Sequence, residues 1–192
     1  ADPHVEVESV AYYEYHLDAG GLHSAGFALG PALWQAHTEH LAWAMTTGSP
    51  DFLDCYEIET DAANPQTYLV DGEPRTVETR TETFVVAGGE PVERVIEYAR
   101  VNGILSPVVV RRDGKILVAV AADAERAGLM HVEFDGLNRA RNVGEARAAL
   151  APLAMFPQNL TIGDADGHVL YVRAGATPRR PAGYDWTKPV PG

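Results

Sequence analysis

The sequence predicts an α+β protein built mainly of antiparallel sheet with few helices. Short apolar stretches flank Asp113-Gly114 and Asp166-Gly167, and such dipeptides favour tight turns between antiparallel strands. The clearest helical pattern lies at 143–154. Neither an internal repeat nor a low-complexity linker divides the chain, so we treat residues 1–192 as a single unit.

The strand predictions rest on alternation and on the two turn dipeptides. Residues 81–86 alternate polar and apolar side chains, as a half-buried strand does. The other predicted strands form two hairpins, in which 106–110 pairs with 115–120, and 160–162 pairs with 169–172.

The helix at 143–154 has both a start signal and an apolar stripe. Asn142 is a capping residue and Glu145 follows three positions later, which is the spacing of a capping box. The stripe recurs at helical spacing through Ala146, Ala149, Leu150 and Leu153. Residues 178–192, rich in Pro and Gly, are expected to form an extended loop.

Composition excludes several classes of function. The net charge of −12 and the pI near 4.9 argue against a nucleic-acid or anionic-membrane partner, because those surfaces attract Lys and Arg. No stretch approaches the roughly 18 apolar residues of a membrane span. Cys55 is the single cysteine, so it forms no internal disulfide, and we interpret it as a small core residue.

Three separated runs carry a resemblance to a known family. Asn159-Leu160-Thr161-Ile162-Gly163-Asp164-Ala165-Asp166-Gly167-His168 is followed by Pro178-Arg179-Arg180. Trp43-Ala44-Met45-Thr46-Thr47-Gly48 precedes Asp51, Asp54 and Tyr56, and Asp2-Pro3-His4 lies near the start. In this order the runs resemble the β chain of penicillin and cephalosporin acylases, which are N-terminal-nucleophile hydrolases. The resemblance implies part of an αββα sandwich of stacked antiparallel sheets.

The resemblance also implies roles for individual residues. The Asn159 side chain and the backbone N–H of Thr47 would stabilise the oxyanion of an acyl-transfer reaction. Arg180, or Arg179 beside it, would hold the nucleophile and the oxyanion asparagine in place, and His4 would orient the nucleophile or contact substrate.

The nucleophile is expected to come from outside this chain. The family uses an N-terminal serine upstream of the Asp2-Pro3-His4 run, with its own α-amino group as the base. We therefore expect the chain alone to be inactive and to require other acylase segments, namely an α chain, a serine-bearing segment and the rest of the β chain. The implied substrate is a small N-acyl amide, and the implied location is periplasmic or secreted.

The chemistry implied by the resemblance requires no cofactor, but a structural calcium ion is a candidate. Asp51, the carbonyl of Leu53 and Asp54 coincide with positions where some family members bind calcium, and hard oxygen ligands suit this ion.

Residues 91–101 have two interpretations. Pro91, apolar residues at helical spacing and a final Asn102-Gly103 favour a helix. The resemblance places a strand there, and we follow the resemblance.

Other functions remain open on the sequence alone. Asn159 could instead cap a local turn or belong to a glycosylation sequon, and Arg180 could be solvated. The chain could be a truncated or degenerate homologue that acts as a binding or structural piece. A metal-dependent hydrolase around His37 and His40 is a third alternative, although their spacing matches neither zinc-protease motif.

Two structural expectations follow from the resemblance. Asn159 Nδ2, the Thr47 N–H and Arg180 should converge on one cleft that faces His4, with Nδ2 and Thr47 N within roughly 8 Å because both donors must reach one oxygen. A sheet separated from its partners should also expose a large apolar patch and self-associate.

Overall fold

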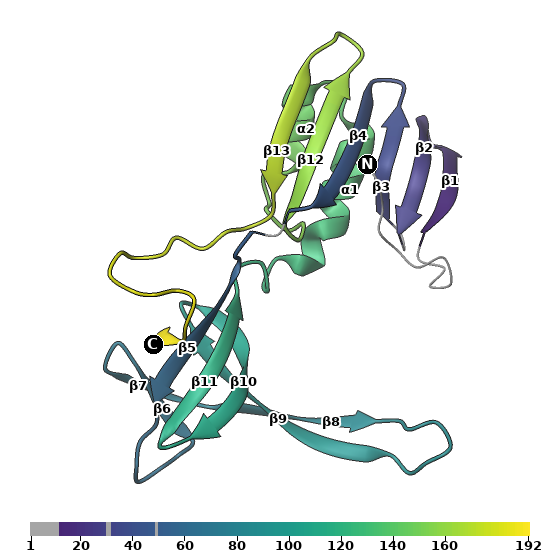
Figure 1. Ribbon diagram of the computed structural model, residues 1–192. Coiled ribbons are helices and arrows are strands. Elements are labelled where there is room, and N and C mark those ends of the chain that lie inside the picture. The colour runs from purple at the N-terminus through teal and green to yellow at the C-terminus, as the bar shows by residue number, and fades with distance from the viewer. Residues whose placement is uncertain (1–11, 30–31, 49) are drawn as a thin grey trace. The chain divides into compact units, whose positions relative to one another are not determined.

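The computed structural model describes residues 12–29, 32–48 and 50–192. They form two compact units, of which unit 1 contains the described residues of 1–50 and residues 126–177, and unit 2 contains residues 51–125 and 178–192 (Figure 1). The stretch expected to be a single unit therefore resolves into two, each with its own sheet and apolar core.

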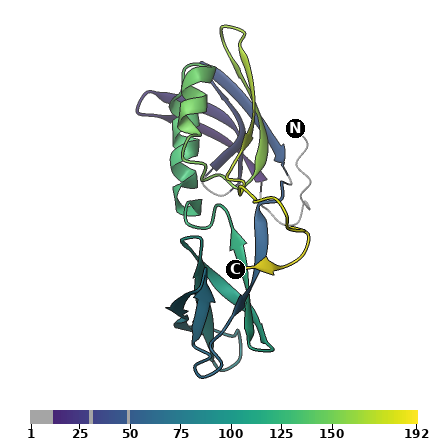
Figure 2. The ribbon, with the colours of Figure 1, turned by 90° about the vertical axis from the view of Figure 1, so that its left-hand side faces the viewer.

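Unit 1 is a six-stranded antiparallel sheet with helices on one face (Figure 2). The helices are α1 (Met130–Arg139) and α2 (Val143–Ala149), and a short 3₁₀ turn, η2 (Ala127–Leu129), precedes α1. In spatial order the strands are β1 (Tyr12–Ala19), β2 (Leu22–Leu29), β3 (Ala32–Thr38), β4 (Leu41–Thr47), β12 (Gln158–Asp164) and β13 (Val169–Ala174).

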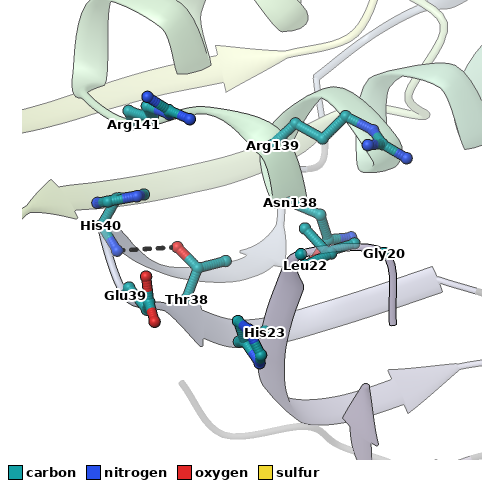
Figure 3. A pocket seen from close by; sticks show the side chains of 10 residues that line it. Gly20, Leu22, His23, Thr38, Glu39, His40, Asn138, Arg139 and Arg141 are labelled. Carbon is teal, nitrogen blue, oxygen red and sulfur yellow. Dashed lines mark hydrogen bonds between the residues drawn. The ribbon is translucent and has the colours of Figure 1, made fainter. Parts of the chain in front are cut away.

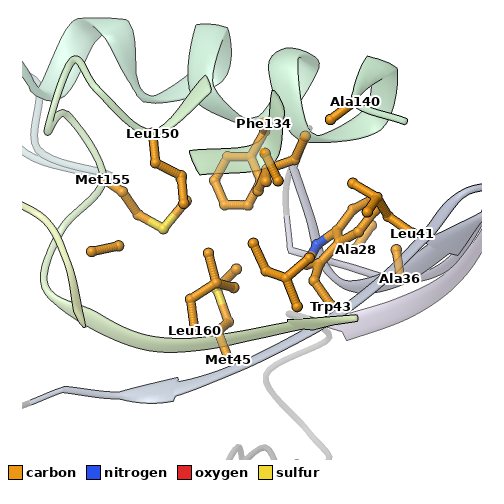
Figure 4. Packing of buried hydrophobic residues seen from close by; sticks show 14 residues of the cluster. Ala28, Ala36, Leu41, Trp43, Met45, Phe134, Ala140, Leu150, Met155 and Leu160 are labelled. Atoms are coloured by element: carbon orange, nitrogen blue, oxygen red, sulfur yellow. The ribbon is translucent and has the colours of Figure 1, made fainter. Parts of the chain in front are cut away.

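Strand alternation decides which face of this sheet becomes the core. In the centre of the sheet, β4 buries Trp43 and Met45, and β12 buries Leu160 and Ile162. These side chains form one cluster with Phe134 of α1 and with Leu150, which directly follows α2 (Figure 4). Leu137 and Ala146 of the helices belong to the same cluster. Because successive strand residues point to opposite faces, Thr46, Asn159 and Thr161 lie on the face away from the helices.

The predicted helix at 143–154 is right at its start and wrong at its end. Asn142 accepts a hydrogen bond from Glu145 N at 2.9 Å, so the capping prediction is confirmed. The helix ends at Ala149, because Pro152 has no N–H to donate and disfavours helical geometry at the residue before it. Leu153 then adopts a left-handed conformation with φ of 55°.

Helix α1 was not predicted, and its composition explains why. It contains Gly136, a weak helix former, and a charged residue, Glu133, at a fully buried position. Gly136 has a packing reason, since a Cβ atom there would lie 2.7 Å from Ala149 Cβ of α2. Glu133 interrupts the apolar stripe by which helices are usually recognised.

Unit 2 is a second six-stranded sheet with a separate two-stranded hairpin. In spatial order the strands of the sheet are β14 (Val190–Pro191), β5 (Leu53–Glu59), β11 (Lys115–Ala121), β10 (Ile104–Arg112), β9 (Val92–Val101) and β8 (Glu78–Phe84). The hairpin pairs β6 (Thr67–Val70) with β7 (Glu73–Thr76). The core of this unit is formed by Ile58, Tyr68, Val70, Val77, Ala99, Val101, Ile116, Val118 and Val120.

Most strand predictions are confirmed. The strand favoured for 91–101 is β9, and the strand predicted at 81–86 is β8, which ends at Phe84. Asp113 and Gly114 have φ of 51° and 73° and join β10 to β11 as a two-residue turn. The hairpin predicted around Asp166-Gly167 is also confirmed, and its turn spans residues 165–168, because β12 ends at Asp164 and β13 begins at Val169.

Two further expectations can be compared with the described residues. Cys55, interpreted as a core residue, is half-buried in β5. Residues 178–192 are largely irregular, as expected, and add the short strand β14 in parallel with β5. None of the helices in the described residues is both long and apolar enough to cross a membrane.

Candidate functional site

The candidate site lies on the open face of unit 1, where β12 begins and β4 ends. Asn159 is the second residue of β12 and is paired in register with Thr46, while Gln158 is paired with Thr47. The Asn159 amide nitrogen donates to Thr47 O at 3.2 Å and approaches Thr46 Oγ1 at 3.4 Å. Sheet pairing thus brings together two residues that are 112 positions apart in the chain.

The orientation of the Asn159 amide is set by Tyr171, which sequence reasoning did not single out. The Tyr171 hydroxyl donates to Asn159 Oδ1 at 2.7 Å. With its oxygen engaged by this donor, the amide presents Nδ2 toward the end of β4. Nδ2 carries two hydrogens, and both have acceptors here, Thr47 O at 3.2 Å and the more distant Thr46 Oγ1 at 3.4 Å.

Strand register contains the signal that identifies Tyr171. Tyr171 lies opposite Thr161 in the β12–β13 hairpin, and Thr161 shares a face of β12 with Asn159. Diagonal neighbours on one face lie within reach of aromatic side chains. Register and alternation together would therefore have placed Tyr171 beside Asn159.

The predicted proximity of Thr47 and Asn159 is confirmed. Three covalent bonds separate the nitrogen and the carbonyl oxygen of any residue, which places Thr47 N within about 7.5 Å of Asn159 Nδ2. Gly48, the next residue, donates its N–H to Pro157 O at 3.2 Å. The roles of Thr47 and Asn159 as oxyanion donors stay predictions, and His4 lies outside the described residues.

Arg180 belongs to unit 2 and is held there by two acidic residues. Its Nε approaches both carboxylate oxygens of Asp54, at 3.0 and 3.1 Å. Its Nη2 donates to Asp51 O at 2.9 Å and lies 3.1 Å from the Asp51 carboxylate. The guanidinium also lies over the Trp186 ring, 5.7 Å from its centre. Arg180 is therefore a bound cation, not the solvated alternative.

The calcium candidates occupy the same place in unit 2. Asp54 is buried, with 3% of its side chain exposed, and Asp51 is largely exposed. Leu53 starts β5 between them. The Asp51 and Asp54 carboxylates proposed for calcium thus contact a guanidinium in this structure. Burial, followed by the Asp54 charge, raises the pKa of the nearby Tyr56 hydroxyl.

The histidines proposed for a metal-dependent hydrolase lie at the opposite end of β4. His37 is an exposed residue near the end of β3 and pairs with Ala42 of β4. His40 lies in the turn before Leu41. The His40 N–H donates to Thr38 Oγ1 at 3.1 Å (Figure 3). Within the described residues no group of at least three His, Cys, Asp or Glu side chains could hold a metal ion.

His40 does line a surface hollow of about 270 Å³ in unit 1. Thr38, Glu39 and Arg141 also contribute to its wall (Figure 3). Cationic and anionic side chains therefore share this hollow, and it gives no charge preference for a ligand.

Comparisons with known proteins identify relatives of this chain. The model of the family described as Penicillin amidase matches residues 1–192. Penicillin G acylase of Escherichia coli is 27% identical over 179 residues, which are 90% of this chain and 21% of that protein. Aculeacin-A acylase of Actinoplanes utahensis is 28% identical over 187 residues, covering 93% of this chain and 23% of that protein.

A solved structure matches the fold over most of the chain. Thermostable penicillin G acylase from Alcaligenes faecalis gives a TM-score of 0.81 at 23% identity, covering 95% of this chain and 33% of that chain. The predicted α+β fold, mainly antiparallel sheet with few helices, is confirmed. The chain spans about a fifth to a quarter of the length of the curated relatives it matches.

Proposed function

The chain belongs to the penicillin amidase family, and we propose that it is a portion of the β chain of a penicillin/cephalosporin-acylase-like amidohydrolase. The proposed reaction is hydrolysis of an N-acyl amide through an acyl-serine intermediate, with the nucleophile supplied from outside residues 1–192. The observation that carries this proposal is the Asn159 amide, which Tyr171 orients beside the end of β4.

The proposed chemistry uses Asn159 and Thr47 as neutral donors. A serine hydroxyl attacks the substrate amide carbon, and its proton passes to the α-amino group of that serine. The substrate carbonyl oxygen then carries negative charge and accepts from the Thr47 N–H and from one N–H of Asn159, which gives up its long contact with Thr46 Oγ1. When the intermediate collapses, the C–N bond breaks and the amine leaves with the proton, after which water hydrolyses the acyl-serine by the same proton route.

We assign the remaining predicted residues supporting roles. Arg180 would orient the nucleophile and Asn159, a task suited to its rigid fork of donors. His4 would contact the serine or the substrate. A structural calcium ion at Asp51, Leu53 and Asp54 would have to share or displace the Arg180 guanidinium, because that group already engages both carboxylates.

The proposed partners are the other acylase segments: an α chain, a serine-bearing segment and the rest of the β chain. The open face of unit 1 supports this proposal, since Val169 and Tyr171 are 74% and 62% exposed there. A periplasmic or secreted location is part of the same proposal.

Activity with and without the missing nucleophile tests the proposal. The chain alone should not hydrolyse penicillin G, glutaryl-cephalosporanic acid or acyl-homoserine lactones. The same chain combined with a serine-bearing segment and the remaining acylase segments should hydrolyse at least one of them. Turnover by the chain alone that a chelator abolishes would favour the metal-dependent hydrolase, and an inactive complete assembly would favour a non-catalytic homologue.

A further inference from the structure

A buried acid on α1 contacts the segment that leads into the candidate site. Glu133 is fully buried, and its carboxylate accepts from Ala154 N at 2.9 Å and from Met155 N at 2.7 Å. Carboxylates are almost never fully buried unless they are paired or hydrogen-bonded. In the described structure both oxygens of Glu133 are satisfied by backbone N–H groups, so the charge is used to hold this stretch of main chain.

The same segment, residues 154–158, is confined by two close backbone approaches. Gly175 has φ of 93°, and a Cβ atom there would lie 2.6 Å from Met155 O. A Cβ atom at Gly48 would lie 3.0 Å from Pro157 O, which accepts the Gly48 N–H at 3.2 Å. Segment 154–158 is thus fixed by Glu133 at one end and by the last residues of β4 at the other.

The position of this segment determines where β12 enters the sheet. Gln158 is the first residue of β12, is 1% exposed and pairs with Thr47. Asn159 follows it directly and reaches Thr47 O. With Gln158 buried and the segment confined, a displacement of Met155 is transmitted to Asn159 over only four residues of chain.

We propose that Glu133 is a positioning residue that fixes Asn159 beside Thr47 through the backbone of Ala154 and Met155. The functional meaning of this inference rests on the proposed role of Asn159 as an oxyanion donor. The physical link from Glu133 to Asn159 does not depend on that role. Losing the carboxylate frees two N–H groups and allows the entry to β12 to shift.

The test is NMR of the ¹⁵N-labelled 192-residue chain with Glu133→Ala, Glu133→Gln and a control, Asp135→Asn. Asp135 is on the same helix, but its carboxylate is exposed and pairs with Arg139. The readouts are the side-chain amide signals of Asn159 and the hydrogen exchange of residues 154 and 155, with Ile162 as the reference for global opening.

Each variant has a distinct expected result. Glu133→Ala should raise exchange at Ala154 and Met155 about tenfold to a hundredfold relative to Ile162, because each loses a charged acceptor. It should also shift the Asn159 side-chain signals. Glu133→Gln keeps one acceptor oxygen and should protect one of the two amides, with a smaller shift at Asn159. Asp135→Asn should change neither readout.

Two outcomes would overturn the inference. One is a Glu133→Gln variant in which Ala154 and Met155 exchange faster while the Asn159 side-chain signals do not move. That result is expected if Glu133 only stabilises the segment and does not position Asn159. The other is unchanged exchange in both Glu133 variants. Since the NMR readout needs no turnover, an acylase assembly that tolerates Asn159→Ala would overturn the oxyanion role and leave the Glu133–Asn159 link intact.

Discussion

The two units use their polar residues in opposite ways. In unit 1 the apolar core lies between the sheet and the helices, while the polar group of interest, Asn159, lies on the other face. Unit 2 has no helix in its described residues, and ion pairs link its strands and loops. These pairs include Arg111 with Glu97, Lys115 with Glu57, and Arg180 with Asp54.

This difference separates substitutions that affect chemistry from those that affect stability. On the open face of unit 1, a polar side chain can be removed without disturbing the core. In unit 2, removal of a paired charge leaves its partner without compensation. The following predictions test that separation.

The largest expected effect is on catalysis through unit 1. In an assembled acylase, Asn159→Ala should lower kcat about a hundredfold to a thousandfold, because one oxyanion donor is lost. Thr161→Ala is the matched control, since Thr161 is exposed on the same face of the same strand. Steady-state kinetics would measure both. The unfolding midpoints of both variants should stay close to that of the parent chain. Equal kcat values for the two variants would contradict the separation of catalytic from stabilising residues.

Core truncation should destabilise each unit separately. Leu137 in unit 1 and Ile116 in unit 2 are both completely buried. Leu137→Ala and Ile116→Ala should each cost about 2 to 5 kcal/mol in the free energy of unfolding. Hydrogen exchange resolved by residue would assign the loss to one unit. Faster exchange throughout both units in either variant would show that the two cores unfold together.

Arg180 should stabilise unit 2 because its planar guanidinium reaches several acceptors at once. Arg180→Lys keeps the charge but loses the fork that reaches Asp54 and Asp51, and we expect a loss of about 1.5 to 3 kcal/mol in unfolding free energy. Arg179→Lys is the matched control, because Arg179 is exposed. Urea unfolding followed by the fluorescence of Trp186, which lies against Arg180, would distinguish them. Indistinguishable curves would refute the structural role.

The smallest effect concerns pH and the β12–β13 turn. Burial would raise the pKa of Asp164, but hydrogen bonds from His168 N and Val143 N outweigh it, so the pKa lies below its usual value. The carboxylate therefore stabilises unit 1 fully above about pH 4. This contribution is lost as the pH falls through the lower folded-state pKa.

A variant isolates that pH dependence. Asp164→Asn should be less stable than the parent chain at neutral pH, and the difference should shrink as the pH is lowered below about 4. Thermal unfolding across pH 2 to 7 would measure it. A difference that stays constant over this range would show that the Asp164 charge makes no contribution. Asp166→Asn, in the exposed part of the same turn, serves as the control.

Local patterns in the sequence predicted the strands better than the helices. Alternation and the Asp113-Gly114 turn located β10 and β11, since both depend on neighbouring residues. Pro152 was a readable stop signal for α2. Helix α1 was not predicted because Gly136 and Glu133 are explained by contacts with residues distant in the sequence. A periodic pattern of apolar residues does not reveal such contacts.

The candidate site depended more on resemblance than on pattern. Nothing in the residues between Thr47 and Asn159 indicates that β4 and β12 are neighbours, because strand pairing is a property of the whole sheet. The resemblance indicated that Thr47 and Asn159 lie close together, and the strand register then places Tyr171 beside Asn159. Glu133 was not found, because its partners are backbone groups about twenty residues away that carry no sequence signature.

The pairing of β4 with β12 has a consequence for folding speed. The Asn159–Thr47 contact closes a loop of 112 residues, and long loops form slowly because closure costs chain entropy. Within unit 2, Ala122 N donates to Phe52 O at 3.0 Å, so a folded unit 2 already joins the two ends of most of that loop. Early folding of unit 2 would lower the closure cost by about 1 kcal/mol and accelerate assembly of the site.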